Sequence, residues 1–198
     1  MTIGVDAGAL SISDKRLQVG VWRVTFELLK QLSCIDKKNQ YRLYSFSPIP
    51  KNILNTLGTN MKNRVLTPSL GYMKFRLPLE LMLHPVDIFL GLSQALPFMS
   101  YGKKIGFIYD IGFLKYPEKY GTSADKLKDQ THYIAKHSDD IVTISQSVKK
   151  DICHEYNTPK ERIHVCYPGV SDVFTQAGKK ETKPYPYFLF VGSLWKGK

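Results

Sequence analysis

The sequence predicts an α/β fold, in which a parallel sheet is sandwiched between helices. Short β-branched and aromatic runs alternate with longer segments of helical period, as in successive strand–helix–strand units. With 43% hydrophobic and 23% charged residues, the 198-residue chain has the composition of a globular protein that buries a core. The longest mainly apolar stretch, Leu77–Met99, is interrupted by charged residues and prolines, so a membrane span is not expected.

Strands are predicted where β-branched, aromatic and other apolar residues run together between turn signals. In chain order the predicted strands are Thr2–Asp6, Tyr41–Ser45, Arg64–Thr67, Asp87–Leu90, Lys104–Ile108, Asp140–Ile144, Ile163–Tyr167 and Tyr187–Val191.

Helices are predicted between these strands, at Val19–Cys34, Phe75–Leu83, Ser123–Lys136 and Gln146–Tyr156. The first has apolar residues at Val21, Val24 and Leu28, a spacing that makes one buried stripe. The last follows Ser145, whose hydroxyl oxygen is expected to cap an unpaired amide of the first turn.

The domain organisation is predicted from a change of pattern near residue 170. Residues 1–170 form one α/β domain, and the polar, lysine- and proline-containing segment 171–186 has the composition of a linker. Residues 187–198 then give one more strand and a loop. Because a single strand cannot bury both faces, we expect the sequence to stop where a second domain opens.

The charge of the chain indicates an affinity for polyanions without naming one. The formal net charge is +11 and the pI is about 9.5, which fits nucleic acid, anionic lipid headgroups or phosphorylated sugars. Basic residues are scattered and no nucleic-acid-binding motif is present, so nucleic acid is not a predicted partner. The N-terminus has no signal sequence and the three cysteines lie far apart, from which a cytoplasmic location without a metal site is expected.

Several loops at predicted strand ends contain candidate binding residues. Gly20 opens the first helix, where an anion site and an ordinary helix start are equally consistent with the residues. Gly91 and Ser93 follow the fourth strand, where open parallel sheets bind ligands, although a plain polar turn explains the same letters. Tyr109 and Asp110 follow the fifth strand, and Asp110 is also an ordinary turn residue.

Five ordered segments resemble motifs of the group 1 (family 4) glycosyltransferases, which have a GT-B fold. They cover essentially the whole chain and are Val5–Leu10 with Gly20–Leu28, Arg76–Pro78 with Asp87–Pro97, Phe107–Tyr120, Asp140–Ile152 with Pro159–Phe174, and Phe188–Lys198. The resemblance implies that residues 1–170 are a Rossmann-like, three-layer α/β/α domain, the acceptor-side half of such an enzyme.

The resemblance also implies roles for individual residues. Gly20 and Arg23 would face the cleft between the two halves, with Gly91, Ser93 and Ser145 as further substrate-side candidates. Tyr109 stands where the family has a histidine that contacts the acceptor, and Asp110 would orient an acceptor hydroxyl. Gly192 and Lys198 would contact the diphosphate of a nucleotide-sugar donor, with no metal or other cofactor.

Two functions follow as expectations. The first is transfer of a hexose, with retention, from a nucleotide-sugar to a glycan or lipid-linked acceptor, with this chain alone inactive. The second is a non-catalytic or degenerate sugar- or phosphate-binding domain, favoured by Gly8 and Tyr109, which replace an arginine and a histidine of the family. The paired glutamates of the family, eight positions apart, are absent from these 198 residues. The mixed basic and apolar segment Tyr72–Leu77 adds an alternative, either peripheral contact with an anionic membrane or a helix start packed on the sheet.

Overall fold

Seven parallel strands form one sheet in the part of the chain that the computed structural model describes, residues 1–14, 18, 20–99, 101–170 and 185–190. Their order across the sheet is β3-β2-β1-β4-β5-β6-β7. The strands are β1 (Thr2–Asp6), β2 (Gln40–Ser45), β3 (Met61–Val65), β4 (Ile88–Gly91), β5 (Lys103–Ile108), β6 (Asp140–Thr143) and β7 (Ile163–Val165).

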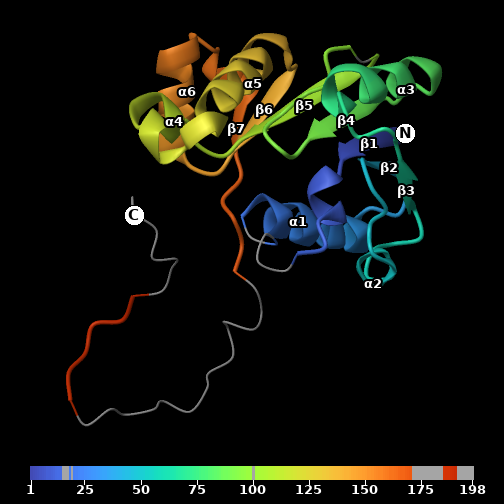
Figure 1. Cartoon of the computed structure of the whole chain (residues 1–198), viewed down its shortest axis with the longest axis horizontal. Helices are drawn as coiled ribbons and strands as arrows, with labels where there is room; N and C mark the ends of the chain where they lie inside the picture. The colour runs from blue at the N-terminus through green and yellow to red at the C-terminus, as the bar shows by residue number, and fades with distance from the viewer. Residues whose placement is uncertain (15–17, 19, 100, 171–184, 191–198) are drawn as a thin grey trace. The chain divides into compact units, whose positions relative to one another are not determined.

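Helices cover both faces of this sheet, as Figure 1 shows with α1 on one face and α3, α5 and α6 on the other. They are α1 (Val21–Ile35), α2 (Lys51–Leu54), α3 (Leu77–Leu83), α4 (Gly112–Lys115), α5 (Ala124–His137) and α6 (Gln146–Tyr156). A π-helical turn, η3 (Tyr72–Arg76), runs directly into α3. The described residues also form short 3-10 turns at η1 (Gly8–Ser11), η4 (Pro117–Lys119), η5 (Gly121–Ser123) and η6 (Lys160–Arg162).

Two buried clusters hold the layers together. Leu29 of α1 packs with Val5 and Leu43 of the sheet, and each of these side chains is 0% exposed. On the other face, the cluster that contains Phe89 and Ile134 extends over β4, β5, α3, α5 and α6. Burial of one such Leu or Phe side chain contributes about 2 kcal/mol. The predicted three-layer α/β/α fold with a Rossmann-like parallel sheet is therefore confirmed.

The strand order creates a switch point between β1 and β4. From β1 the chain winds outward through β2 to β3 and then returns across the sheet to β4, which pairs with β1 in the register Ile3–Ile88 and Val5–Leu90. Because all the strands are parallel, their carboxyl ends meet at one edge of the sheet. At a switch point the loops leaving neighbouring strands diverge, and ligands bind in the crevice between them.

The element predictions succeed in kind and differ mainly at the boundaries. The third strand is Met61–Val65 rather than Arg64–Thr67, because the edge strand β3 is mostly polar and the apolar letters that suggested a strand lie at its end. The helix predicted over Phe75–Leu83 is α3 preceded by η3, and the short helices α2 and α4 were not predicted.

The chain divides into two units, Met1–Tyr167 and Pro168–Lys198. The strand predicted over Tyr187–Val191 is not formed at residues 187–190, which are exposed and carry no regular structure, while Val191 lies outside the described residues. A strand needs a neighbour for its backbone hydrogen bonds, and none pairs with these residues in the described chain. The predicted linker, 171–186, falls almost wholly outside the described residues, and the predicted domain bounds stay predictions.

Candidate functional site

The switch point holds an open pocket of about 1100 Å³. We refer to it as the switch-point pocket. Its walls come from the loops that leave β1, β2 and β4, from η3 and the residues before it, and from η5 and the facing side of α5. The lining residues are Asp6, Gly8, Ala9, Phe46, Ser69, Gly71, Tyr72, Met73, Lys74, Ser93, Ala95, Leu96, Phe98, Ser123, Lys126, Leu127, Asp129, Gln130 and Tyr133.

Asp6 places a buried carboxylate in the wall of this pocket. It is the last residue of β1 and is 2% exposed. Its Oδ1 accepts a hydrogen bond from the Gly8 amide at 3.2 Å, and the Ser93 and Tyr72 side chains also interact with the carboxylate. Burial raises the pKa of Asp6 above its usual value, and these hydrogen bonds offset only part of the effect. Among the described residues Asp6 forms no ion pair, so its charge is met by neutral donors alone.

Tyr72 brings a phenol hydroxyl to the same wall. Its side chain, in η3, is 9% exposed, and its buried hydroxyl interacts with the Asp6 carboxylate but makes no close hydrogen bond in the described chain. Burial raises the pKa of this phenol, and the nearby negative charge of Asp6 raises it further, so the hydroxyl stays protonated at every physiological pH. The pocket wall therefore places a carboxylate acceptor beside a hydroxyl donor.

Aromatic pairs and charged residues make up much of the remaining wall. Phe46 meets Tyr72 edge to face with ring centroids 5.8 Å apart, and Phe98 stacks on Tyr133 at 5.9 Å. The exposed Lys74 and Lys126 side chains and the Asp129 carboxylate also line the pocket. An aromatic wall with a few placed polar groups is the usual character of a small-molecule site.

The two predicted catalytic residues lie beside this pocket and do not line it. The Tyr109 hydroxyl donates to the Leu92 carbonyl at 2.6 Å, and burial followed by the charge of Asp6 raises the pKa of the phenol. Asp110 is exposed, and its Oδ1 accepts from the Gly112 amide at 2.9 Å and from the Tyr120 hydroxyl at 3.0 Å. Both side chains are thus engaged in local structure at the end of β5.

Among the other predicted site residues on the strand ends, Ser93 lines the switch-point pocket and Gly91 does not. A Cβ atom on Gly91 would lie 2.3 Å from the Ala95 carbonyl oxygen, so this glycine lets the loop after β4 fold back on the strand. Gln94, with φ of 53°, fastens the same loop: its amide nitrogen donates to Thr131 Oγ1 at 2.9 Å and its oxygen accepts from the Tyr109 amide at 3.3 Å.

The remaining predicted site residues lie on helix starts or outside the described chain. Gly20, with φ of 53°, is the exposed N-cap of α1, and Arg23 is exposed one turn later; neither lines the pocket. Ser145 caps α6 as expected, since its hydroxyl accepts from the Val148 amide at 3.2 Å. Gly192 and Lys198 lie outside the described residues.

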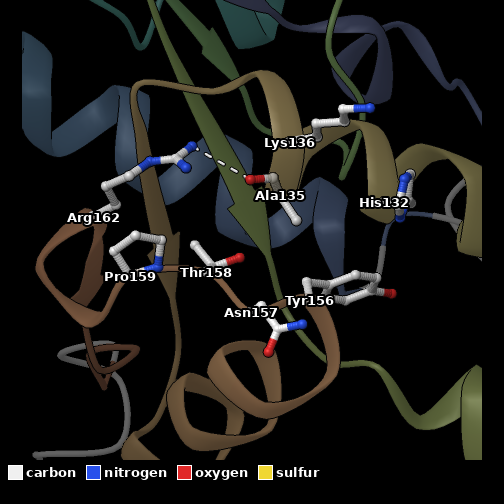
Figure 2. Close-up of a pocket in the computed structure, with 8 residues that line it drawn as sticks. All are labelled: His132, Ala135, Lys136, Tyr156, Asn157, Thr158, Pro159 and Arg162. Atoms are coloured by element: carbon white, nitrogen blue, oxygen red, sulfur yellow. Dashed lines mark hydrogen bonds between the residues drawn. The ribbon is translucent and has the colours of Figure 1, made fainter.

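A second, smaller pocket of about 350 Å³ lies between α5, the end of α6 and η6, and Figure 2 shows its lining residues. Arg162 reaches across it toward the Ala135 carbonyl and also donates to the Ser138 and Asp139 carbonyls. These groups lie in the last turn of α5 and just after it, where a helix leaves carbonyls unpaired, so the guanidinium acts as a C-terminal cap. None of the predicted site residues lines this pocket.

Comparison with family models and with curated proteins finds no match for this sequence. The assignment of function therefore depends on the site itself. Within the described residues, no helix is both long and apolar enough to cross a bilayer. Among the residues that the structure describes, no three histidine, cysteine, aspartate or glutamate side chains lie close enough together to hold a metal ion.

The residues that sequence reasoning missed are Asp6 and Tyr72. The sequence did contain a signal for Asp6. A carboxylate at the last position of an apolar strand lies at the carboxyl edge of a parallel sheet, where such sheets bind ligands. Tyr72 had none, since its approach to Asp6 depends on the crossover from β3 to β4, which sequence spacing does not describe.

Proposed function

We propose that this chain is the acceptor-side half of a nucleotide-sugar-dependent glycosyltransferase, and that the switch-point pocket binds the hydroxyls of a glycan or lipid-linked acceptor. The observation that carries the proposal is the placement of the Asp6 carboxylate beside the Tyr72 hydroxyl in one pocket wall, with no close hydrogen bond from that hydroxyl within the described chain.

The chemistry of that pair selects for an alcohol. The Tyr72 hydroxyl interacts only weakly with Asp6 and can donate to a ligand oxygen, while the Asp6 carboxylate can accept from a further donor. A sugar hydroxyl is both donor and acceptor, so one hydroxyl bridging the two residues satisfies both. A hydrogen bond to a buried charge contributes about 1.5–3 kcal/mol, which is enough to favour a ligand that can donate to Asp6.

The sequence resemblance supports the same assignment. The segments Val5–Leu10, Asp87–Pro97 and Phe107–Tyr120 each cross the carboxyl edge of the sheet, where the pocket opens. In this account Gly192 and Lys198 belong to the donor half, the nucleotide-sugar supplies the reactive sugar, and no metal or other cofactor is used. Transfer requires donor and acceptor to be enclosed together, so the chain alone is inactive. The account places the protein in the cytoplasm, without nucleic acid as a partner.

A non-catalytic sugar-binding domain is the second candidate. The observation that favours it is the engagement of both predicted catalytic groups: the Tyr109 hydroxyl is tied to Leu92 and the Asp110 carboxylate to Gly112 and Tyr120. In that case the switch-point pocket binds the same class of ligand without a reaction at its edge.

Saturation-transfer NMR with maltose and cellobiose tests binding by the full 198-residue chain. We expect saturation to reach the sugar protons in the wild type and expect Asp6→Asn to weaken binding about tenfold, because the charge-assisted hydrogen bond is lost. Asp110→Asn is the matched control, since it removes a carboxylate that follows β5 at the same edge of the sheet and does not line the pocket. Equal weakening by both variants, or no transfer to either sugar, would count against the proposal.

A further inference from the structure

The outer side of the η3–α3 segment exposes a row of large apolar side chains. Phe75, Leu79, Met82 and Leu83 are 72%, 47%, 44% and 66% exposed, respectively. Their spacing of four, three and one places them on one side of the helix. We call these four residues the α3 apolar face.

The opposite side of α3 is already buried in the core. Leu77 and Leu81 are both 0% exposed and belong to the buried cluster that contains Phe89 and Ile134. A helix that is apolar on all sides is normally covered all round. Nothing in the described chain covers the α3 apolar face, so it is a surface available to a partner.

The charges around this face favour an anionic partner. Lys74 and Arg76 flank Phe75 in η3. The single acidic residue of the segment, Glu80, is 5% exposed and points inward to an ion pair with Arg64. The outer side therefore combines apolar and basic groups without an exposed carboxylate, and the chain as a whole has a net charge of +11. An apolar row beside basic residues is the pattern of helices that lie in the surface of an anionic bilayer.

The same segment forms one wall of the switch-point pocket. Tyr72, Met73 and Lys74 line that pocket immediately before Phe75, and Phe98, which is 68% exposed, lines it from the β4–β5 loop. A bilayer that receives the α3 apolar face would therefore lie close to the pocket.

We propose that the α3 apolar face docks on an anionic membrane surface, so that the switch-point pocket receives a lipid-linked acceptor from that surface. The identity of the acceptor rests on the proposed function, whereas the docking itself does not. Apolar side chains enter the headgroup region while Lys74 and Arg76 meet the lipid phosphates, an arrangement that holds a protein at the surface without a membrane span.

Vesicle sedimentation tests the docking with the full chain. Vesicles of equal parts phosphatidylcholine and phosphatidylglycerol are expected to sediment the wild type, and pure phosphatidylcholine vesicles are not. The double variant Phe75→Ser/Leu79→Ser keeps the net charge and is expected to lower the partition coefficient at least about tenfold. Ile35→Ser is the matched control, because Ile35 is an apolar side chain 77% exposed at the end of α1 and should leave sedimentation unchanged.

Three results would overturn the proposal. Equal sedimentation of the wild type and the double variant would mean that net charge alone attracts the chain to the vesicles. No sedimentation of the wild type would exclude docking. A wild type that is dimeric by light scattering, with a monomeric double variant, would assign the face to a second copy.

The sugar-binding measurement separates this proposal from the proposed function. The double variant is expected to bind maltose or cellobiose as the wild type does, since neither Phe75 nor Leu79 lines the pocket. Asp6→Asn is expected to lose sugar affinity and to keep vesicle binding. Loss of both properties in either variant would contradict the separation of the two surfaces.

Discussion

At the scale of single residues, the site is defined by an aspartate that is poorly placed for stability. Asp6 is buried without a cation, and its charge is met by the Gly8 amide and by the Ser93 and Tyr72 side chains. Burial without full compensation disfavours the ionised form. An arrangement that costs stability at neutral pH is typical of residues retained for binding, and it gives a direct thermodynamic test.

Asp6→Asn is expected to raise the stability of the chain at pH 7 by about 1 kcal/mol, because the amide accepts from Gly8 without a buried charge. The folded pKa of Asp6 is raised above its usual 3.8, so below that pH the carboxyl is protonated in both folded and unfolded states and carries no penalty. The penalty develops as the pH rises from there through the folded pKa. Urea unfolding at several pH values measures it.

The stability advantage of Asp6→Asn should therefore vanish in acid and grow toward neutral pH. A variant that is less stable than the wild type at pH 7 would show that the Asp6 charge is stabilised by its surroundings. Asp110→Asn serves as the control, because its carboxylate is exposed.

At the scale of elements, the loop that leaves β4 positions much of the pocket wall. This loop carries Ser93 to Asp6 and is fixed by Gln94, which spans β5 and α5. It can fold back closely only because Gly91 has no side chain, since the nearest neighbour of a Cβ atom would be the Ala95 carbonyl at 2.3 Å. The predicted binding glycine is thus a packing residue that shapes the site indirectly.

Gly91→Ala is expected to destabilise the chain by about 1–3 kcal/mol, because the clash is with backbone that cannot rotate away. It should also weaken sugar binding by displacing Ser93. Gly169→Ala is the matched control: a Cβ there meets nothing within 4 Å, so it should be neutral or slightly stabilising. Thermal unfolding compares the two, and similar melting temperatures would refute the packing role of Gly91.

The elements themselves followed from the sequence more readily than the site did. The core strands alternate with amphipathic helices, so Thr2–Asp6 and Gln146–Tyr156 were predicted at their observed bounds. The edge strand β3 was displaced because it buries little and therefore lacks an apolar signature. A helix start packed on the sheet was one of the two expectations for Tyr72–Leu77, but the π-helical form of η3 was not predicted. Tyr72 in this turn packs edge to face on Phe46 of the loop after β2, a contact that sequence spacing does not describe.

At the scale of the whole molecule, parallel topology is what brings the site together. Strand order 3-2-1-4-5-6-7 places the ends of β1 and β4 side by side and sends the β3–β4 crossover over them with Tyr72. Ser93, a residue predicted from the sequence, lines the pocket at the carboxyl edge of the sheet, because loops after parallel strands share that edge. The sequence pointed to Tyr109 and Asp110 rather than to Asp6 and Tyr72. The contact between Asp6 and Tyr72 depends on the β3–β4 crossover, and the spacing of residues in the sequence does not reveal it.

The most direct measurement is a crystal structure of the chain grown with maltose or cellobiose, whichever binds more tightly. The account predicts a sugar in the switch-point pocket, with one hydroxyl oxygen within hydrogen-bond distance of both the Asp6 carboxylate and the Tyr72 hydroxyl. A sugar bound in the smaller pocket beside Arg162, or one in the switch-point pocket that touches neither Asp6 nor Tyr72, would contradict it.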